Sequence, residues 1–249
     1  MTPRFRFFFA LLAATAAILL IAEPAVAQQV NINLGDNATL TGRIVQLVAL
    51  VTILSLAPSI LIVVTSFTRI IVVLSLLRSA LGIQQTPPNT VLISLALFLT
   101  AFIMAPTFTK AYNEGVAPFM SEQIEAADAF QKTVEPFKEF MLAHVRDKDL
   151  KLFLDMSNSP PPATAIDTPL QVLIPAFLIG ELSRAFEIGF LLFVPFVVID
   201  MVIASVLMSM GMMMLPPVMI SLPFKLIFFV LVDGWSLVAG SLVKGFGVT

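Results

Sequence analysis

The sequence predicts an all-α, membrane-associated protein built from kinked helical hairpins, with a small water-facing helical insert between them. Hydrophobic residues make up 58% of the 249 residues and charged residues only 12%, and the mean hydropathy is +0.99. Soluble domains are closer to one quarter charged, so this balance indicates a membrane protein. The apolar residues form long runs that are interrupted by prolines, whereas most acidic residues gather in one central segment.

Residues 1–27 have the pattern of a cleaved signal peptide. Arg4 and Arg6 form a positive n-region, an apolar stretch follows, and an Ala-Val-Ala sequence ends at Ala27. We expect cleavage between Ala27 and Gln28, which would place the mature N-terminus outside the cytoplasm. The alternative is an uncleaved first span.

A first helical hairpin is expected over residues 44–106, after a polar N-terminal arm at 28–43. Ile44–Val64 is apolar over a length that can cross a bilayer, and we expect the helix to continue to Gly82. Val91–Ala105 is short for a span and is ended by Pro106.

The first hairpin also carries two arginines, Arg69 and Arg78. Nine residues at about 100° each place them on opposite faces of one helix. Both therefore cannot reach water from a single lipid-facing side, and we interpret them as packing charges or cytoplasm-side anchors.

Residues 107–168 are expected to form a water-facing helical insert, because they hold ten acidic and six basic residues. We expect it on the periplasmic side, because the acidic excess offers no positive-inside signal and an N-terminus outside the cytoplasm also places the insert there. An amphipathic stripe at helical spacing runs through the insert, and Pro136 is expected to divide it into two helices. The stripe consists of Met120, Ile124, Ala127, Phe130, Val134, Phe137, Met141 and His144.

A second helical hairpin is expected over residues 169–249, kinked at Pro175 and Pro195. Glu181, Arg184 and Glu187 are successive i,i+3 neighbours on one sector of this apolar run and could pair with one another. Charges are costly in a bilayer, so they are expected to face protein.

A methionine-rich break lies inside the second hairpin, since seven of the twelve methionines fall between Met201 and Met219. Gly211 precedes a Met triplet and Pro216-Pro217 follows it, which argues against a straight helix. Methionine is flexible and apolar, so the stretch could be an adaptable lip on a helix break, filler in a protein core or, less plausibly, a copper(I) site.

Several function classes find no support in the sequence. The net charge of −2 offers no basic surface for nucleic acid, and there is no cysteine and only one histidine, His144, to bind a metal. Motifs for a nucleophile, a zinc site or a phosphate loop are missing, so we expect no enzyme, no cofactor and no metal. One Trp and one Tyr against 22 Phe leave almost no aromatic belt at a lipid interface, which favours packing on other proteins.

Five sequence blocks carry a resemblance to a known family. They are Ser66–Gly82, Pro175–Phe190, Pro195–Asp200, Met210–Pro217, and Leu222–Lys225 with Val232–Trp235. Together they resemble the P subunits of type III export gates, the FliP family of flagella and its injectisome relatives. The resemblance covers nearly all of the chain from about Ile44, with a glycine at Gly180 where the family pattern has serine.

The resemblance implies a non-enzymatic channel subunit that assembles with further copies of itself, with Q and R subunits and with an FlhB-type subunit. It implies a place in the bacterial inner membrane, within the flagellar basal body, where unfolded export substrates pass through the channel. It also implies that a methionine loop, here Met212, Met213 and Met214 with Met210 adjacent, lines the pore as a gasket.

The charged residues of the apolar segments are expected to form assembly ion pairs. Glu181, Arg184, Glu187 and Lys225 are the first candidates, and we expect Lys225 to pair with Glu181 in the same or a neighbouring subunit. Asp200 and Asp233 are secondary packing charges. The alternative for these groups is a proton or ion path.

Two other functions compete with a flagellar channel subunit. One is the P subunit of an injectisome, which the predicted signal peptide disfavours by resemblance alone. The other is a secondary transporter with a charged midplane site, which would need internal repeats that the two halves of the chain do not show.

Overall fold

The computed structural model describes residues 40–83, 85–157, 162–212 and 215–247, and every element in these ranges is helical. The predicted all-α fold is confirmed for them. The signal peptide at 1–27 with its Ala27–Gln28 cleavage site, and the polar arm up to residue 39, lie outside the described residues. The chain forms two compact units, with the boundary between Ile53 and Leu54.

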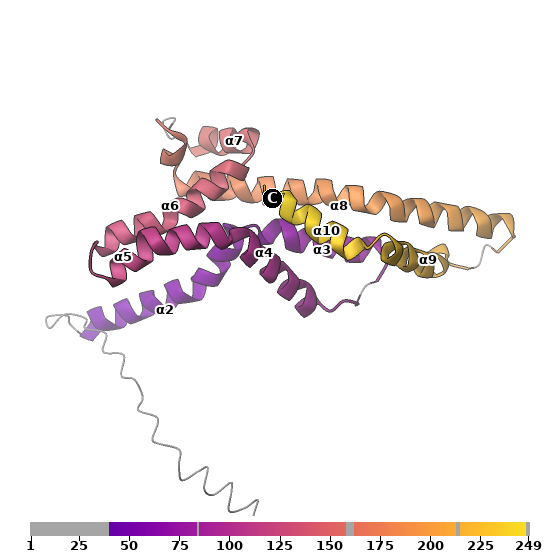
Figure 1. Cartoon of the computed structure of the whole chain (residues 1–249), viewed down its shortest axis with the longest axis horizontal. Helices are drawn as coiled ribbons and strands as arrows, with labels where there is room; N and C mark the ends of the chain where they lie inside the picture. Colours follow the sequence, from indigo (N-terminus) through magenta and orange to yellow (C-terminus); the bar gives the residue numbers. More distant parts are fainter. Residues whose placement is uncertain (1–39, 84, 158–161, 213–214, 248–249) are drawn as a thin grey trace, which may run out of the picture. The chain divides into compact units, whose positions relative to one another are not determined.

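The elements follow one another without a strand in the described ranges (Figure 1). They are α2 (Leu40–Val63), α3 (Phe67–Ala80), α4 (Asn89–Ala111), the π-helix η1 (Tyr112–Val116), α5 (Ala117–Met120), α6 (Ala126–His144), α7 (Asp147–Ser157), the 3-10 turn η2 (Ala165–Asp167), α8 (Leu170–Ser209), α9 (Pro217–Leu231) and α10 (Gly234–Lys244).

Helix α3 is the centre of the larger unit, and its sequence explains why. Apolar residues recur at i, i+3, i+4 and i+7, so one face is continuous and apolar. That face is buried and packs against α4, α8 and α10. It consists of Phe67, Ile70, Val73, Leu74, Leu77 and Ala80. Burial of these side chains supplies many van der Waals contacts, which hold helices together in an apolar environment as well as in water.

The expectation of one helix from Ile44 to Gly82 is wrong, because the helix breaks at residues 64–66. Hydroxyl groups compete with the helical hydrogen bonds there. Thr65 Oγ1 donates to Ile62 O at 3.3 Å and accepts from the Phe67 N–H at 3.4 Å. The Thr68 hydroxyl also donates to Ile62 O, at 3.4 Å.

Pro106 does not end its helix either. Helix α4 passes through it to Ala111, and the helical path continues through η1 and α5 to Met120. The continuous stretch Asn89–Met120 is 32 residues long and apolar enough to cross a membrane, whereas the 15-residue apolar run predicted only a marginal span. Proline removes one hydrogen bond, which a long helix with packed neighbours can tolerate.

The insert differs from expectation in one helix and in its buried face. Helix α6 is continuous through Pro136, whose ring is buried, so the predicted division there is wrong. The predicted stripe is buried at Met141, but Phe130 is 70% exposed and Met120 is 72% exposed. The first half of α6 buries Ala129 instead. Phe130 and Val134 line an open pocket together with Leu170.

Helix α8 carries the insert along its N-terminal part, where both α6 and α7 pack on it (Figure 1). It extends over 40 residues through Pro175 and Pro195, and the kinks expected at these prolines stay a prediction. By length and composition α8 can cross a membrane, as can the bent pair α9 and α10, which meet at 61°. That bend at Asp233-Gly234 was not expected, although an Asp-Gly pair is a turn signal.

We predict that Gly115→Ala destabilises the chain by about 1–3 kcal/mol, through overpacking between η1 and α6. A Cβ at Gly115 would lie 2.8 Å from the Thr133 backbone nitrogen and 3.0 Å from Ala129 O, and backbone atoms cannot move aside cheaply. Thermal unfolding of the detergent-purified protein measures the effect.

The matched control is Gly180→Ala, because a Cβ there meets Asp149 Oδ2 at an ordinary 3.5 Å. We expect the control to keep the melting temperature of the parent protein. An equal loss in both variants would contradict the close approach of η1 and α6.

Candidate functional site

The methionine-rich break is a well-formed helix end rather than a frayed one. Helix α8 closes with the hydrogen bonds of a Schellman motif, in which Gly211 N–H donates to Met208 O and Met212 N–H donates to Leu207 O. Gly211 has a φ of +74°, a left-handed conformation that glycine adopts without strain. The predicted interruption of the helix is confirmed, and its position follows from this glycine.

The side chains of the break point away from the chain's own core. Met210 is 64% exposed, Met212 is 44% exposed and Met219 is 70% exposed. Met213 and Met214, which are also predicted to belong to the gasket, lie outside the described residues. Pro216 and Pro217 then start α9, where a proline at the first helical position lacks only an N–H that would have no partner.

A buried cation connects the helices on the two sides of the break. Lys225 of α9 is 4% exposed, and its Nζ donates to Asp200 Oδ2 of α8 at 2.7 Å. The other oxygen of Asp200 accepts from the Ser221 hydroxyl. Lys225 also donates to Ala80 O at 3.2 Å, a carbonyl at the C-terminal end of α3, where positive charge is favourable.

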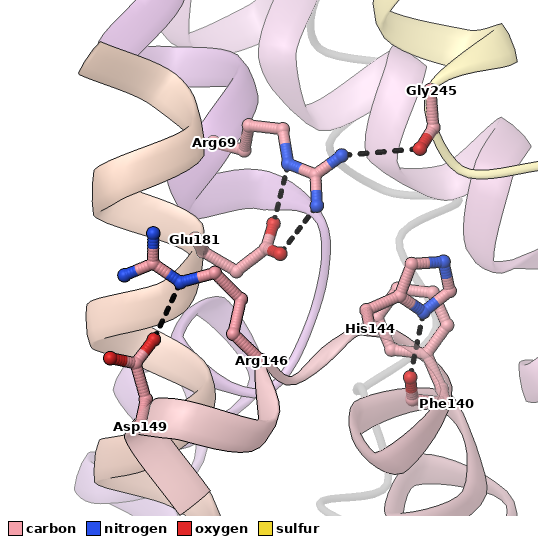
Figure 2. Close-up of polar contacts among 7 residues, drawn as sticks. All are labelled: Arg69, Phe140, His144, Arg146, Asp149, Glu181 and Gly245. Carbon is pink, nitrogen blue, oxygen red and sulfur yellow. Dashed lines mark hydrogen bonds and ion pairs between the residues drawn. The ribbon is translucent and has the colours of Figure 1, made fainter. Parts of the chain in front are cut away.

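A second buried charge pair connects α3, α8 and the C-terminal segment (Figure 2). The Arg69 guanidinium donates two hydrogen bonds to the Glu181 carboxylate, with Nε 2.8 Å from Oε2, and the side chains are 2% and 0% exposed. Its third nitrogen donates to Gly245 O at 3.3 Å. The guanidinium carbon lies 3.7 Å from the ring centre of Phe246, a cation–π contact.

A third network ties the insert to α8. Arg146 Nε donates to Asp149 Oδ2 at 2.6 Å (Figure 2), and Arg146 Nη2 donates to Ser183 Oγ at 2.7 Å. Arg146 Nη1 lies 3.6 Å from Glu187 Oε1, but that carboxylate is 69% exposed. Nearby, the His144 ring lies against Phe140, and its Nδ1 is 2.7 Å from Phe140 O.

These contacts correct the predicted pairing of Lys225 with Glu181. The structure gives each a different partner, Asp200 for Lys225 and Arg69 for Glu181. Which charges pair depends on which helices face each other in the fold, and the spacing of charges along the sequence does not contain that information. Arg69 and Asp200, which were expected to be packing charges of lower rank, each supply one partner of these pairs; Arg69 is buried, whereas Asp200 is 31% exposed.

The remaining charges have looser surroundings. Arg78 donates to Asn89 Oδ1 at 2.6 Å and to Pro87 O at 3.3 Å, so it stabilises the connection between α3 and α4. Within the described residues, Arg184 and Asp233 make no ion pair, and Glu181, Arg184 and Glu187 do not pair with one another. Asp233 is exposed and has a φ of +49° at the bend between α9 and α10.

The Arg146 network and the Gly245–Phe246 contacts were missed by sequence reasoning. Arg146 lies in the charged insert, where every charge looked like part of a solvated face. A possible signal is its place next to Val145, between two helices, because charges at helix junctions often bind neighbouring backbone or side chains. No cluster of three metal-ligating carboxylates or imidazoles occurs among the described residues.

Comparison with known proteins gives the same family for the profile match and for the similar relatives. The FliP family profile matches residues 50–242. A Caulobacter vibrioides protein named flagellar biosynthetic protein FliP is 63% identical over 235 residues, covering 94% of this chain and 88% of the relative. Proteins of the same name are 56% identical in Bacillus subtilis, over 81% of this chain and 91% of the relative, and 50% identical in Aquifex aeolicus, over 81% and 85%.

We predict that Arg69→Met or Glu181→Leu alone destabilises the chain by about 3–5 kcal/mol, because each leaves an unpaired buried charge. The double variant should recover much of the loss, since it leaves no charge behind. Thermal or denaturant unfolding of the purified protein measures all three. Lys110→Met is the control, because the Lys110–Glu139 pair is exposed and should be dispensable.

The corrected partner of Lys225 can be tested with two double-mutant cycles. The cycle of Lys225→Met with Asp200→Leu should show a coupling of about 0.5–3 kcal/mol, whereas that of Lys225→Met with Glu181→Leu should be close to additive. Unfolding free energies of the single and double variants provide both values. A larger coupling to Glu181 than to Asp200 would contradict the observed pairing.

Proposed function

Because the chain belongs to the FliP family, whose named relatives are flagellar biosynthetic proteins, we propose that it is a channel-forming core subunit of the flagellar type III protein export gate. It would pass unfolded flagellar substrates across the bacterial inner membrane. The family match, over residues 50–242 and with 63% identity to a curated relative, is the observation that carries this proposal. The relatives' names favour the flagellar branch over an injectisome.

The exposed surface supports assembly with other proteins. Helix α8 exposes a long set of apolar side chains, although only one Trp and one Tyr are available to suit a lipid interface. Exposed apolar patches of this extent mark interaction surfaces. The partners in this proposal are further copies of the chain, Q, R and FlhB-type subunits, and the membrane. The exposed set of α8 is Ile179, Phe186, Phe190, Leu191, Val194, Val197, Val198, Met201, Val202, Val206 and Met208.

The buried charge pairs suit this assembly because they fix each chain's own helices before the partners meet. Lys225 and Asp200 hold α9 against α8, and Arg69 and Glu181 hold α3 against α8. In the proposed orientation the insert, residues 107–168, faces the periplasm, and the whole subunit is part of the flagellar basal body. Arg184 and Asp233 are left without ion pairs within the described residues and are available to other subunits.

The methionine break is proposed to be the gasket of the pore, an apolar constriction made by side chains from several copies. Its exposure argues against a role as core filler within one chain: Met210 is 64% and Met212 is 44% exposed. An apolar constriction loses its water and blocks ions. Thioether side chains have three rotatable bonds, so they can move aside for peptide side chains of many sizes.

Contacts within the chain hold the two helix ends that flank the break, whereas the described methionine side chains between them are exposed. The backbone is fixed on the α8 side by the Schellman hydrogen bonds at Gly211 and Met212, and on the α9 side by Lys225. The described methionine side chains of the break are exposed, with Met210 at 64% and Met212 at 44%. The two helix ends that flank the loop can therefore keep their place during transport while exposed methionine side chains change rotamer.

We predict that replacing Met212, Met213 and Met214 by alanine leaves assembly intact but makes the complex leak. Shorter side chains leave the constriction wide enough to fill with water, so ions and small solutes pass. Flux of a small fluorescent anion through vesicles that contain the purified complex measures the leak.

Met156→Ala is the control, because Met156 is 68% exposed in the insert, away from the break. It should leave vesicles as tight as the parent complex. Unchanged flux in the triple variant, with the complex intact, would contradict the gasket.

A further inference from the structure

An open groove lies between α4 and α10, with a volume of about 590 Å³. Leu99 and Phe102 of α4 form one wall, and Phe102 is 62% exposed. The other wall is α10, which presents small side chains and ends in a cation. We call this surface the α4–α10 groove; it is lined by Leu99, Phe102, Ser236, Ala239, Gly240, Val243 and Lys244.

Gly240 in this groove has no explanation within the chain. Nothing lies within 4 Å of the position a Cβ would occupy, and its φ is not in the left-handed region. Glycine inside a helix costs about 1 kcal/mol relative to alanine. A glycine in mid-helix often allows the close approach of another backbone or side chain. No group of the described chain lies within 4 Å of the position that a Cβ of Gly240 would take, so the close approach is open to another molecule.

Lys244 closes one end of the groove. It is exposed, and it makes no ion pair with any residue that the structure describes. Arg69 donates to Gly245 O and also pairs with Glu181 of α8. The C-terminal end of α10 therefore lies level with Glu181 along α8. A partner for the groove should therefore be apolar along its length and should carry a carboxylate at the corresponding end.

Helix α8 has such a surface on its outer face. Residues at helical spacing from Glu187 towards the methionine break are all exposed, with Phe190 at 69%, Val194 at 45% and Val198 at 52%. The Glu187 carboxylate is 69% exposed, and its one ion contact, with Arg146, is long at 3.6 Å. We call this surface the α8 ridge; it consists of Glu187, Phe190, Val194, Val198 and Met201.

The two surfaces match in direction and in length. Helix α8 runs from the insert towards the methionine break, and α10 runs in the opposite direction. The first residue of α10, Gly234, lies beside Leu192 and Pro195 of α8, whereas Gly245, just after the end of α10, accepts from Arg69. At about 1.5 Å per residue, Glu187 to Val194 spans about 10 Å, and Lys244 to Ser236 spans about 12 Å. Glu187 beside Lys244 thus places Val194 near Ser236, with Phe190 near Gly240.

We propose that the α8 ridge of one copy lies in the α4–α10 groove of the next copy, with Glu187 paired to the neighbour's Lys244. This interface rests on the proposed function, because it needs several copies in one complex. The two surfaces are different parts of the chain, so the contact is head-to-tail and continues from copy to copy as a ring or a helix. Because glycine has no side chain, Gly240 leaves room for Phe190 or its neighbours on the ridge.

Crosslinking between two tagged forms of the chain tests this contact, and the natural sequence has no cysteine to interfere. One form carries Val194→Cys and the other Ser236→Cys, and both are expressed together in the complete complex. We expect an oxidised product that contains both tags. The matched control replaces Val194→Cys by Val230→Cys, since Val230 is 74% exposed on α9 outside both surfaces, and it should give no product.

Two further variants test the same contact without a crosslink. Glu187→Lys and Lys244→Glu alone should each reduce the number of copies in the purified complex, and the double variant should restore it. Gly240→Leu should also cause loss of copies, while the melting temperature of the dispersed chain should not fall, because the groove has space for the side chain within one copy and leucine is the better helix former. Gly180→Ala is the control for a helical glycine outside the groove.

The outcomes separate the interface from the proposed function. If both tags purify in one complex but neither the crosslink nor the charge reversal behaves as expected, the interface is wrong and the channel subunit stands. A parent chain that purifies only as single copies contradicts the proposed function, and the interface with it.

Discussion

The buried pair of Arg69 and Glu181 constrains the arrangement of the larger unit more than any other contact. Two charges in an apolar environment are tolerable only when every polar atom has a partner, and here the guanidinium binds both carboxylate oxygens, Gly245 O and the Phe246 ring. These groups come from α3, α8 and the segment after α10. A helix that rotated or slid would leave a charge unpaired, so the pair selects one register among the many that apolar packing alone would accept.

That register decides which face of α8 points outward. From Glu181 to Val194 there are thirteen positions, so the two side chains lie about 140° apart around the helix. Turning Glu181 towards Arg69 therefore turns Val194 away from the core, as its 45% exposure shows. Asp200 lies about 100° from Glu181 around the helix, at the side of α8, and meets Lys225 of α9 there. The inner face of this helix thus carries one buried, paired charge, Glu181, among apolar core residues, and its outer face is largely apolar.

The sequence was sufficient for the helical fold class and for the break at Gly211 and Pro216, because composition and local backbone chemistry determine both. It was misleading at Pro106 and Pro136, where the local rule says that a helix should end and the surrounding packing keeps it intact. Ion-pair partners could not be read from spacing, since Lys225 is as suited to Glu181 as to Asp200 until the facing of the helices is known. The left-handed Asp233 was predictable from its Asp-Gly context but was hidden inside an apolar run.

The methionine break and the outer face of α8 depend on the same constraint. One chain supplies one break, and one break cannot surround a pore, so a seal of this kind requires neighbouring copies in a defined register. The charge pairs contribute to that register indirectly, because they orient α8, whose C-terminal end leads into the break. A change that rotates α8 would displace the assembly surface and the methionine side chains together. The proposed seal therefore depends on the charge pairs as well, although none of the paired residues belongs to the break itself.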